Sequence, residues 1–253
     1  MKRIAIVLAA CFAAAMAPIQ ATASDVKLLA GASMRVLLPE LLPQFEKASG
    51  HKVTVEYGTL GVITDRISKG EDADLVIVTG AQNDALQKEG KLVVGSRAEL
   101  AKAGYGVLAK AGAAKPDLGT VEAFKRTMLG AKSVALGDPA GGGPLGVYSA
   151  DLLQRLGIAD DLKTKTKLLP SGTQVAEAVA KGESEIGIGL ASDAVVVPGL
   201  VAIGLPAEIQ TYTTYTLGVI ASSKQVDAAK ALITFLTSPA AKQALAAKGF
   251  VPQ

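Results

Sequence analysis

The chain has 253 residues, 49% of them hydrophobic, and its formal net charge at pH 7 is +3. A chain with so small a net charge does not have the excess of basic residues that binding to phosphate backbones requires, which argues against nucleic acid as a partner. The only cysteine, Cys11, lies in the N-terminal segment that is expected to be cleaved, so one histidine and oxygen ligands remain for a metal; no acidic calcium-loop pattern occurs, and we expect no metal site.

The first residues read MKRIAIVLAACFAAAMAPIQATASD, with a basic start, an apolar run and small residues before Ser24. These features predict a secretory signal peptide over residues 1–23, cleaved after Ala23, and hence a mature protein in the periplasm. The apolar run is shorter than the roughly 20 residues of a spanning helix, so we do not expect a membrane-embedded protein. The rival interpretation is a lipoprotein cleavage box that ends at Cys11.

Short apolar runs alternate with segments of helical period almost to the end of the chain. The runs predict strands at residues 26–31, 52–57, 73–80, 105–110, 133–138, 165–170, 185–190, 200–205 and 213–221. Helices are predicted at 34–48, 61–69, 81–89, 120–129, 145–156, 172–181, 225–237 and 239–248. This alternation is typical of an α/β fold with parallel sheets and helices on both faces. So many strands exceed one sheet of typical size, which indicates two sub-domains.

Ligands of open α/β sheets bind beyond the C-terminal ends of strands, where loops lead into helices. The strand-to-helix junctions of this chain are rich in Gly, Ser, Thr and Ala, at residues 31–35, 57–62, 79–84, 137–146, 170–175 and 189–194. Each presents backbone N–H groups at a helix start, where the helix dipole favours an anion. One such junction could be an ordinary capped turn, but their repetition favours a cleft for a small anion.

Ordered segments along the chain resemble periplasmic molybdate-binding proteins, which are type II solute-binding proteins that feed ABC transporters. The segments are GAS before an apolar helix, ADLVI, GDP with the glycine-rich turn and LLQRLGI, GIGLASDA, and the closing FLTSPAAKQALAAKGF. The resemblance implies two lobes, each a sheet flanked by helices, joined by two crossover strands around the ligand cleft. Lobe 1 would hold residues 24–103 and 216–253, and lobe 2 would hold residues 104–215. A monomer is the default for this architecture.

The resemblance implies a ligand set of serine and tyrosine hydroxyls and main-chain amides, which carries over unevenly. The matching positions and their neighbours are Ser33, Thr59, Leu60, Gly143, Leu145, Gly146, Gly172, Thr173 and Leu190. Leu60 stands where the family has a second serine, and Leu190 stands where it has the tyrosine. Each missing donor should cost about 1.5–3 kcal/mol, or roughly tenfold to a hundredfold in affinity. We therefore expect that molybdate is not the ligand.

Arg35 lies two residues after Ser33, in the first turn of a predicted helix, where a cation opposes the helix dipole. An arginine there suits a bidentate contact with a carboxylate, and the alternative is a solvent-facing side chain. The glycines at 141–143 would make room for a ligand larger than a tetrahedral oxyanion. Together these features favour a small di- or tricarboxylate. A molybdate, tungstate or sulfate ion, with water in place of the lost donors, is the weaker alternative.

Two functions remain open for such a cleft. In the first, the protein is a non-catalytic carrier that closes on the anion and docks on an ABC transporter permease. In the second, the chain shifts a proton across an allylic system without a cofactor, because it also resembles periplasmic aconitate isomerase of the same superfamily. We favour the carrier, since a shared fold does not establish catalysis.

An isomerase of this kind needs a general base. The single histidine, His51, comes before the second predicted strand and is expected at the surface, away from the cleft. Tyr57, Tyr148 and Tyr215 are the acid–base candidates, although a tyrosine base needs a pKa well below about 10. Their alternative role is packing and hydrogen bonding along the cleft. Asp193 is assigned as a helix N-cap.

Overall fold

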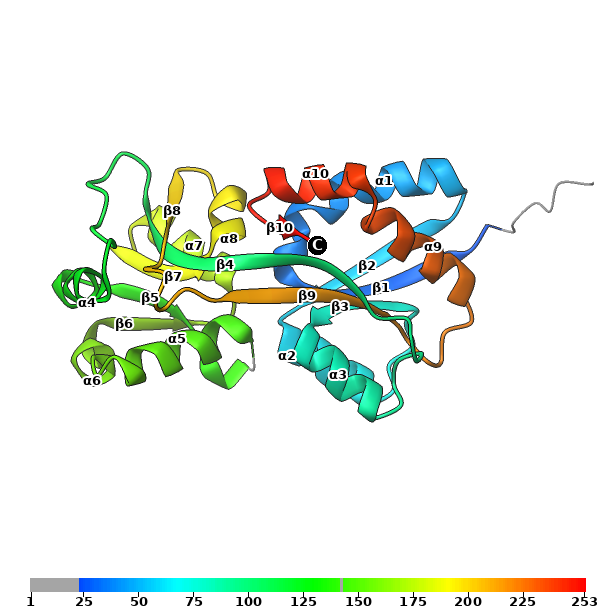
Figure 1. The fold of residues 1–253 in the computed structure, drawn as a ribbon, viewed down its shortest axis with the longest axis horizontal. Helices are drawn as coiled ribbons and strands as arrows, with labels where there is room; N and C mark the ends of the chain where they lie inside the picture. The colour runs from blue at the N-terminus through cyan, green and yellow to red at the C-terminus, as the bar shows by residue number, and fades with distance from the viewer. Residues whose placement is uncertain (1–22, 142) are drawn as a thin grey trace, which may run out of the picture.

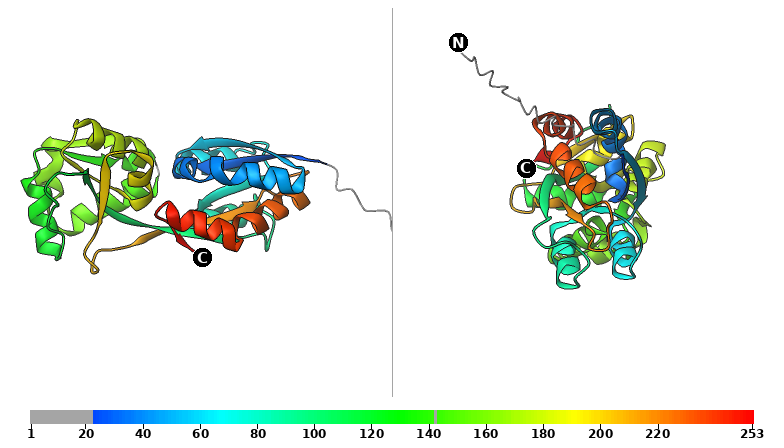
Figure 2. Two further views of the ribbon diagram at one scale, coloured as in Figure 1. Left: turned by 90° about the horizontal axis from the view of Figure 1, so that it is seen from above. Right: turned by 90° about the vertical axis from the view of Figure 1, so that its right-hand side faces the viewer.

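The computed structural model describes residues 23–141 and 143–253, so the predicted signal peptide lies outside the described residues apart from its last position. Two lobes lie side by side along the long axis, and the strands β4 (Ala98–Lys110) and β9 (Tyr212–Val219) run between them (Figure 1). The same separation is clear from above (Figure 2). This is the predicted two-lobed α/β architecture with two crossover strands. The exact lobe boundaries at 103/104 and 215/216 stay a prediction.

Lobe 1 is built on a sheet whose strands follow the order β2-β1-β3-β9-β4. Its parallel part consists of β1 (Asp25–Gly31), β2 (Lys52–Gly58) and β3 (Leu75–Thr79), and β9 pairs antiparallel with β3. The remaining elements of the lobe are a 3-10 helix, η1 (Ala32–Val36), α1 (Leu38–Ser49), α2 (Leu60–Ser68), α3 (Gly80–Lys88), α9 (Val226–Leu236), α10 (Pro239–Ala247) and β10 (Val251–Pro252). β1 and β3 are apolar runs that are buried on both faces, as central strands covered by helices require.

Lobe 2 is built around the second half of β4, which pairs antiparallel with β7 (Ile186–Leu190) and β8 (Leu200–Gly204). β5 (Val134–Gly137) pairs in parallel with β7 and with β6 (Thr166–Leu169). The longer elements that cover this sheet are α4 (Val121–Gly130), α5 (Pro144–Arg155) and α7 (Gly172–Lys181). Shorter pieces are η2 (Pro139–Gly141), α6 (Ala159–Leu162), η3 (Lys163–Lys165) and α8 (Ala191–Val196).

The sheets are mixed, which corrects the prediction of parallel sheets. Each predicted strand and helix has an observed counterpart, but both crossover strands pair antiparallel with their neighbours. The predicted strand at 105–110 is only the second half of β4. Its first half, AELAKAG, lacks the β-branched residues that mark a strand and is extended because β9 and β10 pair with it on either side. α6 and α8 are too short to give a helical period.

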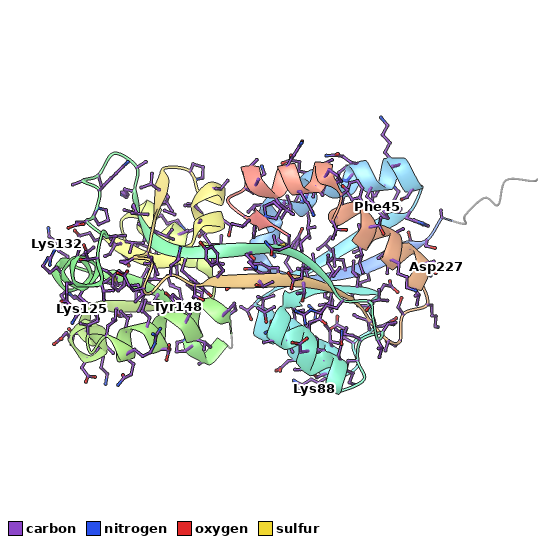
Figure 3. All side chains as sticks on the ribbon, viewed as in Figure 1. Phe45, Lys88, Lys125, Lys132, Tyr148 and Asp227 are labelled. Atoms are coloured by element: carbon purple, nitrogen blue, oxygen red, sulfur yellow. The ribbon has the colours of Figure 1, made fainter. Side chains whose placement is uncertain are left out.

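His51 corrects a second prediction, because it is only 9% exposed and not a surface residue. Its Nδ1 accepts a hydrogen bond from the Ser24 backbone N–H at 3.1 Å, and its ring stacks on Phe45 with centroids 6.0 Å apart. Phe45, labelled in Figure 3, in turn packs against α9 through Phe235, with ring centroids 5.6 Å apart. The imidazole therefore joins the start of β1 to α1 and α9, in the part of lobe 1 that the cleft does not reach.

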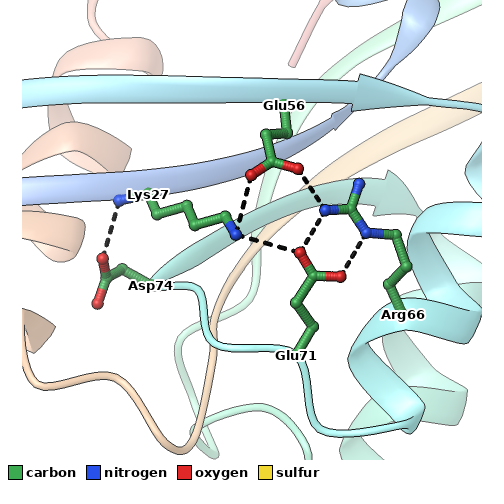
Figure 4. Close-up of polar contacts among 5 residues, drawn as sticks. All are labelled: Lys27, Glu56, Arg66, Glu71 and Asp74. Carbon is green, nitrogen blue, oxygen red and sulfur yellow. Dashed lines mark hydrogen bonds and ion pairs between the residues drawn. The ribbon is translucent and has the colours of Figure 1, made fainter.

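Four charged side chains join β1, β2, α2 and the loop before β3 on one side of lobe 1 (Figure 4). Lys27 Nζ lies 2.9 Å from Glu56 Oε1 and 3.1 Å from Glu71 Oε1. The Arg66 guanidinium pairs with both carboxylates, so positive and negative groups alternate around a closed ring. Arg66 holds the pKa of Glu71 at about 2, below its ordinary value of 4.5. This cluster fixes the edge strand β2 to α2 and to the loop before β3.

We expect Glu71→Gln to destabilise the protein by about 1 kcal/mol at pH 7, because the ring loses one of its anions while the partners stay partly hydrated. A folded-state pKa below the unfolded one means that the stabilisation is complete above pH 4.5 and is lost as the pH falls towards about 2. Urea unfolding between pH 7 and pH 3 should show the gap between wild type and variant narrowing below pH 4.5. Glu208→Gln, an exposed change outside the ring, is the control, and an identical pH profile for both variants would contradict the prediction.

Candidate functional site

A cleft between the lobes brings together residues from η1, β2, α2, β5, α5, α7, α8 and β9. Its cavity volume is about 60 Å³, and it is open to solvent on one side. The lining residues are Ala32, Ser33, Gly58, Thr59, Leu60, Gly137, Asp138, Gly143, Pro144, Leu145, Gly146, Pro170, Ser171, Gly172, Thr173, Leu190, Asp193 and Tyr215. The set contains no lysine, arginine or histidine, so hydrogen bonds and helix dipoles must hold a bound anion.

The helix starts converge on this cleft from both lobes. The N-cap residues of α2, α5, α7 and α8 all line it, and they are Thr59, Gly143, Ser171 and Leu190. Two of these caps bind their own helix through a hydroxyl: Thr59 accepts from Val62 N–H at 3.3 Å, and Ser171 accepts from Gln174 N–H at 3.3 Å. The junction at 79–84 is different, because Thr79 and Gly80 open onto another hollow near Arg97. Five of the six predicted junctions therefore form the site.

The glycines of DPAGGGPLG have different roles. A Cβ on Gly146 would lie 2.5 Å from Asp138 C and 2.7 Å from Pro139 N, so the first turn of α5 packs directly on the preceding backbone. Gly137, at the end of β5, packs against the same turn of α5, because a Cβ on Gly137 would lie 2.8 Å from Gly146 N. Gly143 has open space around it. The missing side chains at 137 and 146 thus serve close backbone packing, whereas the space at Gly143 is left to the cleft.

Hydroxyl groups make up much of the polar lining. Ser33 Oγ donates a hydrogen bond to the Tyr215 hydroxyl at 3.1 Å, which joins η1 to the crossover strand β9. Burial raises the pKa of Tyr215, so its phenol stays protonated. Thr173, at the start of α7, adds a further hydroxyl. The Ser171 hydroxyl is bonded to Gln174 of its own helix, accepting from the backbone N–H and donating to Oε1 at 3.1 Å, so of Ser171 and Tyr215 only Tyr215 keeps a hydroxyl proton to donate.

Arg35, Tyr57 and Tyr148 do not line the cleft. Arg35 is exposed, and its guanidinium lies over the Tyr57 ring, 4.3 Å from the centroid. Tyr148, in lobe 2 (Figure 3), stacks on Tyr105 with centroids 4.1 Å apart and donates to Ile209 O at 2.6 Å. The role of Arg35 as a ligand contact stays a prediction that requires a movement of its side chain.

The tyrosines are unsuited to be bases. Burial raises the pKa of Tyr57, and it raises the pKa of Tyr105 and of Tyr148 to about 12. Tyr215 shifts in the same direction. A base must lose its proton near neutral pH, and these phenols hold theirs more tightly than free tyrosine. This direction is opposite to the shift that a tyrosine base requires, and of the four phenols only that of Tyr215 lines the cleft.

Asp193 lines the cleft, which the sequence analysis did not predict. It is the third residue of α8 rather than its N-cap, and its Oδ2 accepts a hydrogen bond from the Leu190 N–H at 3.1 Å. The residue is 1% exposed, and burial raises the pKa of its carboxyl to about 6 although the Leu190 hydrogen bond lowers it. Within the described part of the chain, no cation forms an ion pair with it. Its place on the wall of the cleft could not be read from the local pattern ASDA.

Residues 23–141 and 143–253 contain no cluster of three metal-ligating side chains and no helix with the length and apolarity needed to cross a bilayer.

The fold and the cleft between two lobes define a solute-binding protein. A family model described as bacterial extracellular solute-binding protein matches residues 26–251, and the chain belongs to that family. The chain is similar to an aconitate isomerase of a Pseudomonas species, with 32% identity over 220 residues, 84% of this chain and 82% of the relative. It is also 28% identical over 245 residues to the molybdate-binding protein ModA of Azotobacter vinelandii, 91% of each chain.

The solved structure of the periplasmic molybdate-binding protein of Azotobacter vinelandii has the same fold. Its TM-score to this chain is 0.75 at 21% sequence identity, over 90% of this chain and 100% of that one. The fold is therefore that of type II periplasmic binding proteins, as predicted.

Proposed function

We propose that this protein is a periplasmic, monomeric carrier whose cleft closes on a small organic anion with more than one carboxylate group. The convergence of four helix starts from both lobes on one cleft is the observation that carries this proposal. Main-chain amides at those starts are suited to carboxylate oxygens. A closed carrier of this family would deliver its ligand to an ABC transporter permease.

Two features of the cleft favour an organic anion over a tetrahedral oxyanion. Leu60 and Leu190, on opposite lobes, place apolar side chains where the molybdate-binding family has hydroxyl donors. Gly143 leaves open space next to the start of α5. A larger ligand can use that space and the hydroxyls of Ser33 and Tyr215, whereas a small oxyanion would leave part of its charge without a donor.

A thermal-shift panel tests the proposal with citrate, cis-aconitate, trans-aconitate, molybdate, tungstate and sulfate. A carboxylate present at 100 times its Kd should stabilise the protein by about 2.7 kcal/mol, which is a readily measured shift. We expect one of the three organic acids to give the largest shift. A larger shift with molybdate or tungstate would contradict the choice of ligand class, and no shift with any of the six would contradict an anion site.

Arg35→Ala is expected to lower the affinity for the organic acid with the largest thermal shift by at least tenfold, because a charge-assisted hydrogen bond contributes about 1.5–3 kcal/mol. The expectation requires the guanidinium to leave the Tyr57 ring when the lobes close on the ligand. Isothermal titration of wild type and variant measures the change. Lys47→Ala is the control, since it removes an exposed positive charge from the same lobe. Equal losses in both variants, or none in either, would exclude a contact with Arg35.

Aconitate isomerisation in the same cleft is the second candidate function. It is favoured by the 32% identity to an aconitate isomerase and by the buried carboxylate of Asp193 on the cleft wall. This function needs no cofactor, because an allylic proton shift requires only anchors for the carboxylates and a base near an acidic C–H bond. Formation of trans-aconitate from cis-aconitate by the purified protein, followed by NMR, tests it.

A further inference from the structure

Asp193 stands out among the carboxylates because it is at once buried and on the wall of the cleft. Asp138 also lines the cleft, but it is only half-buried and its Oδ1 caps the Ala140 N–H at 2.9 Å. A negative charge on the wall of an anion site repels the ligand, and no described cation pairs with Asp193 to offset that repulsion. Asp193 is therefore a buried carboxylate on the cleft wall whose observed hydrogen-bond partner is the Leu190 N–H.

The carboxylate is held in place from two directions. Its Oδ2 accepts the Leu190 N–H at the start of α8. Gly172, the first residue of α7, packs against the same group so closely that a Cβ there would lie 2.9 Å from Asp193 Cγ. One oxygen is thereby anchored to the main chain, and the position of the second is fixed by the plane of the group. A fixed carboxylate in reach of a bound molecule is the geometry that a proton acceptor needs.

Asp193 is the only buried carboxylate among the described residues that line the cleft. The titratable side chains that face it are the phenols of Tyr105 on β4 and Tyr215 on β9, and both are held protonated by burial. Charged residues on η1 and α7, such as Arg35 and Lys181, form no ion pair with it. Burial also makes Asp193 a stronger base than an exposed aspartate, while it remains largely ionised at neutral pH.

We propose that Asp193 is the general base of the cleft and removes a proton from the carbon next to a carboxylate of a bound unsaturated organic acid. The inference rests on the second candidate function above. In the step, the C–H bond breaks, an O–H bond forms on Asp193, and the electron pair moves through the adjacent C=C bond toward the far carbon of the allyl unit. The far carbon then takes a proton from Asp193 or from water. Substrate and product are isomers, and no oxidant or reductant takes part.

The hydroxyls of Ser33 and Tyr215 have a supporting role in this step. They lie on the opposite lobe and on the crossover strand, hydrogen bonded to each other at 3.1 Å and lining the same cleft. Ser33 donates its proton to the Tyr215 oxygen, so the Tyr215 hydroxyl is the one that donates to a carboxylate of the substrate and stabilises the negative charge that develops when the proton leaves. The base on α8 and the donor on the crossover strand β9, held by Ser33 of lobe 1, then act on one ligand.

Asp193→Asn tests the assignment, because the amide keeps an oxygen for the Leu190 N–H and loses the ability to take a proton. The probe is cis-aconitate in deuterium oxide, with exchange of its methylene protons and formation of trans-aconitate followed by proton NMR. We expect the wild type to catalyse both and the variant to be at least a hundredfold slower, while cis-aconitate still raises its melting temperature. Asp151→Asn, an exposed change on α5, is the control and should keep the wild-type rate.

A measurement on the wild type alone guards against a variant that fails to fold. The exchange rate should rise with pH through a midpoint near or above pH 6, because the ionised carboxylate is the active form and a bound anion raises its pKa further. A rate that is flat between pH 5 and pH 8, or exchange that persists in Asp193→Asn, would overturn the assignment. Binding of cis-aconitate without exchange in the wild type would overturn it too and leave the carrier function standing. Absence of binding by any organic acid of the panel would instead overturn the proposed function itself.

Discussion

Replacement of Gly146 by alanine is expected to destabilise the protein by about 3 kcal/mol or more. The added methyl group would lie 2.5 Å from Asp138 C and 2.7 Å from Pro139 N. These are main-chain atoms, so no side-chain rotation relieves the overlap, and either the η2 turn or the first turn of α5 must move. Since the first turn of α5 lines the cleft, ligand affinity should fall together with stability. Chemical unfolding and calorimetric titration measure the two effects.

Gly143→Ala is the matched control, three residues earlier in the same loop. Its φ of −76° is open to any residue, and nothing lies within 4 Å of its virtual Cβ. The change should be neutral or stabilise by about 0.4–1 kcal/mol, because alanine restricts the unfolded chain. A loss of ligand affinity in this variant without a loss of stability would indicate that the ligand approaches the Gly143 backbone. Equal destabilisation by both substitutions would contradict the packing argument for Gly146.

The double variant Leu60→Ser, Leu190→Tyr is expected to gain affinity for molybdate by about 10² to 10⁴. Each restored hydroxyl should contribute about 1.5–3 kcal/mol to a small oxyanion held by hydrogen bonds, and both positions line the cleft. The side chains are 6% and 4% exposed, so the variant also alters packing. Calorimetric titration with molybdate, on protein shown to be folded, measures the gain.

The control pair Leu60→Ala, Leu190→Phe makes similar changes in volume without adding a hydroxyl. A gain in molybdate affinity that appears only in the Ser and Tyr variant is caused by the added hydrogen bonds. Equal gains in both variants would show that the change in side-chain volume is the cause. No gain in either would contradict the view that these two leucines exclude oxyanions. The outcome would then favour Arg35 and the loop at 137–146 as the determinants of specificity.

Much of the fold could be predicted because hydrophobic period and turn residues are local properties. The strand at residues 26–31 and the helix at 172–181, with Ser171 as its cap and Gly182 after it, are examples. The first half of β4 could not be predicted, because its extended form depends on β9 and β10, which lie more than 100 residues later. His51 is predicted at the surface because it precedes the second predicted strand, whereas its burial depends on contacts with α1 and α9.

The candidate site likewise has parts that local sequence predicts and parts that depend on tertiary packing. Helix starts such as those at Thr59 and Gly172 follow from strand-to-helix junctions, and they line the cleft as the pattern indicates. Tyr215 reaches Ser33 across 182 positions of sequence, a contact set by the register of β9 in the sheet. Asp193 carries a local signal only for capping, and its burial depends on how α7 and α8 pack. Such properties of three-dimensional packing leave no mark on the neighbouring residues.

The position of β9 between β3 and β4 has a consequence for how the protein is made. A nascent chain emerges with its N-terminus first, so β1, β2 and β3 appear long before residues 212–219. Until β9 arrives, β3 presents an unpaired edge, which is the kind of surface that invites aggregation. The strands β4 to β8 follow one another in the chain and can assemble earlier. Lobe 1 is therefore completed last. A chaperone that assists folding would act on the unpaired edge of β3 before β9 is available to pair with it.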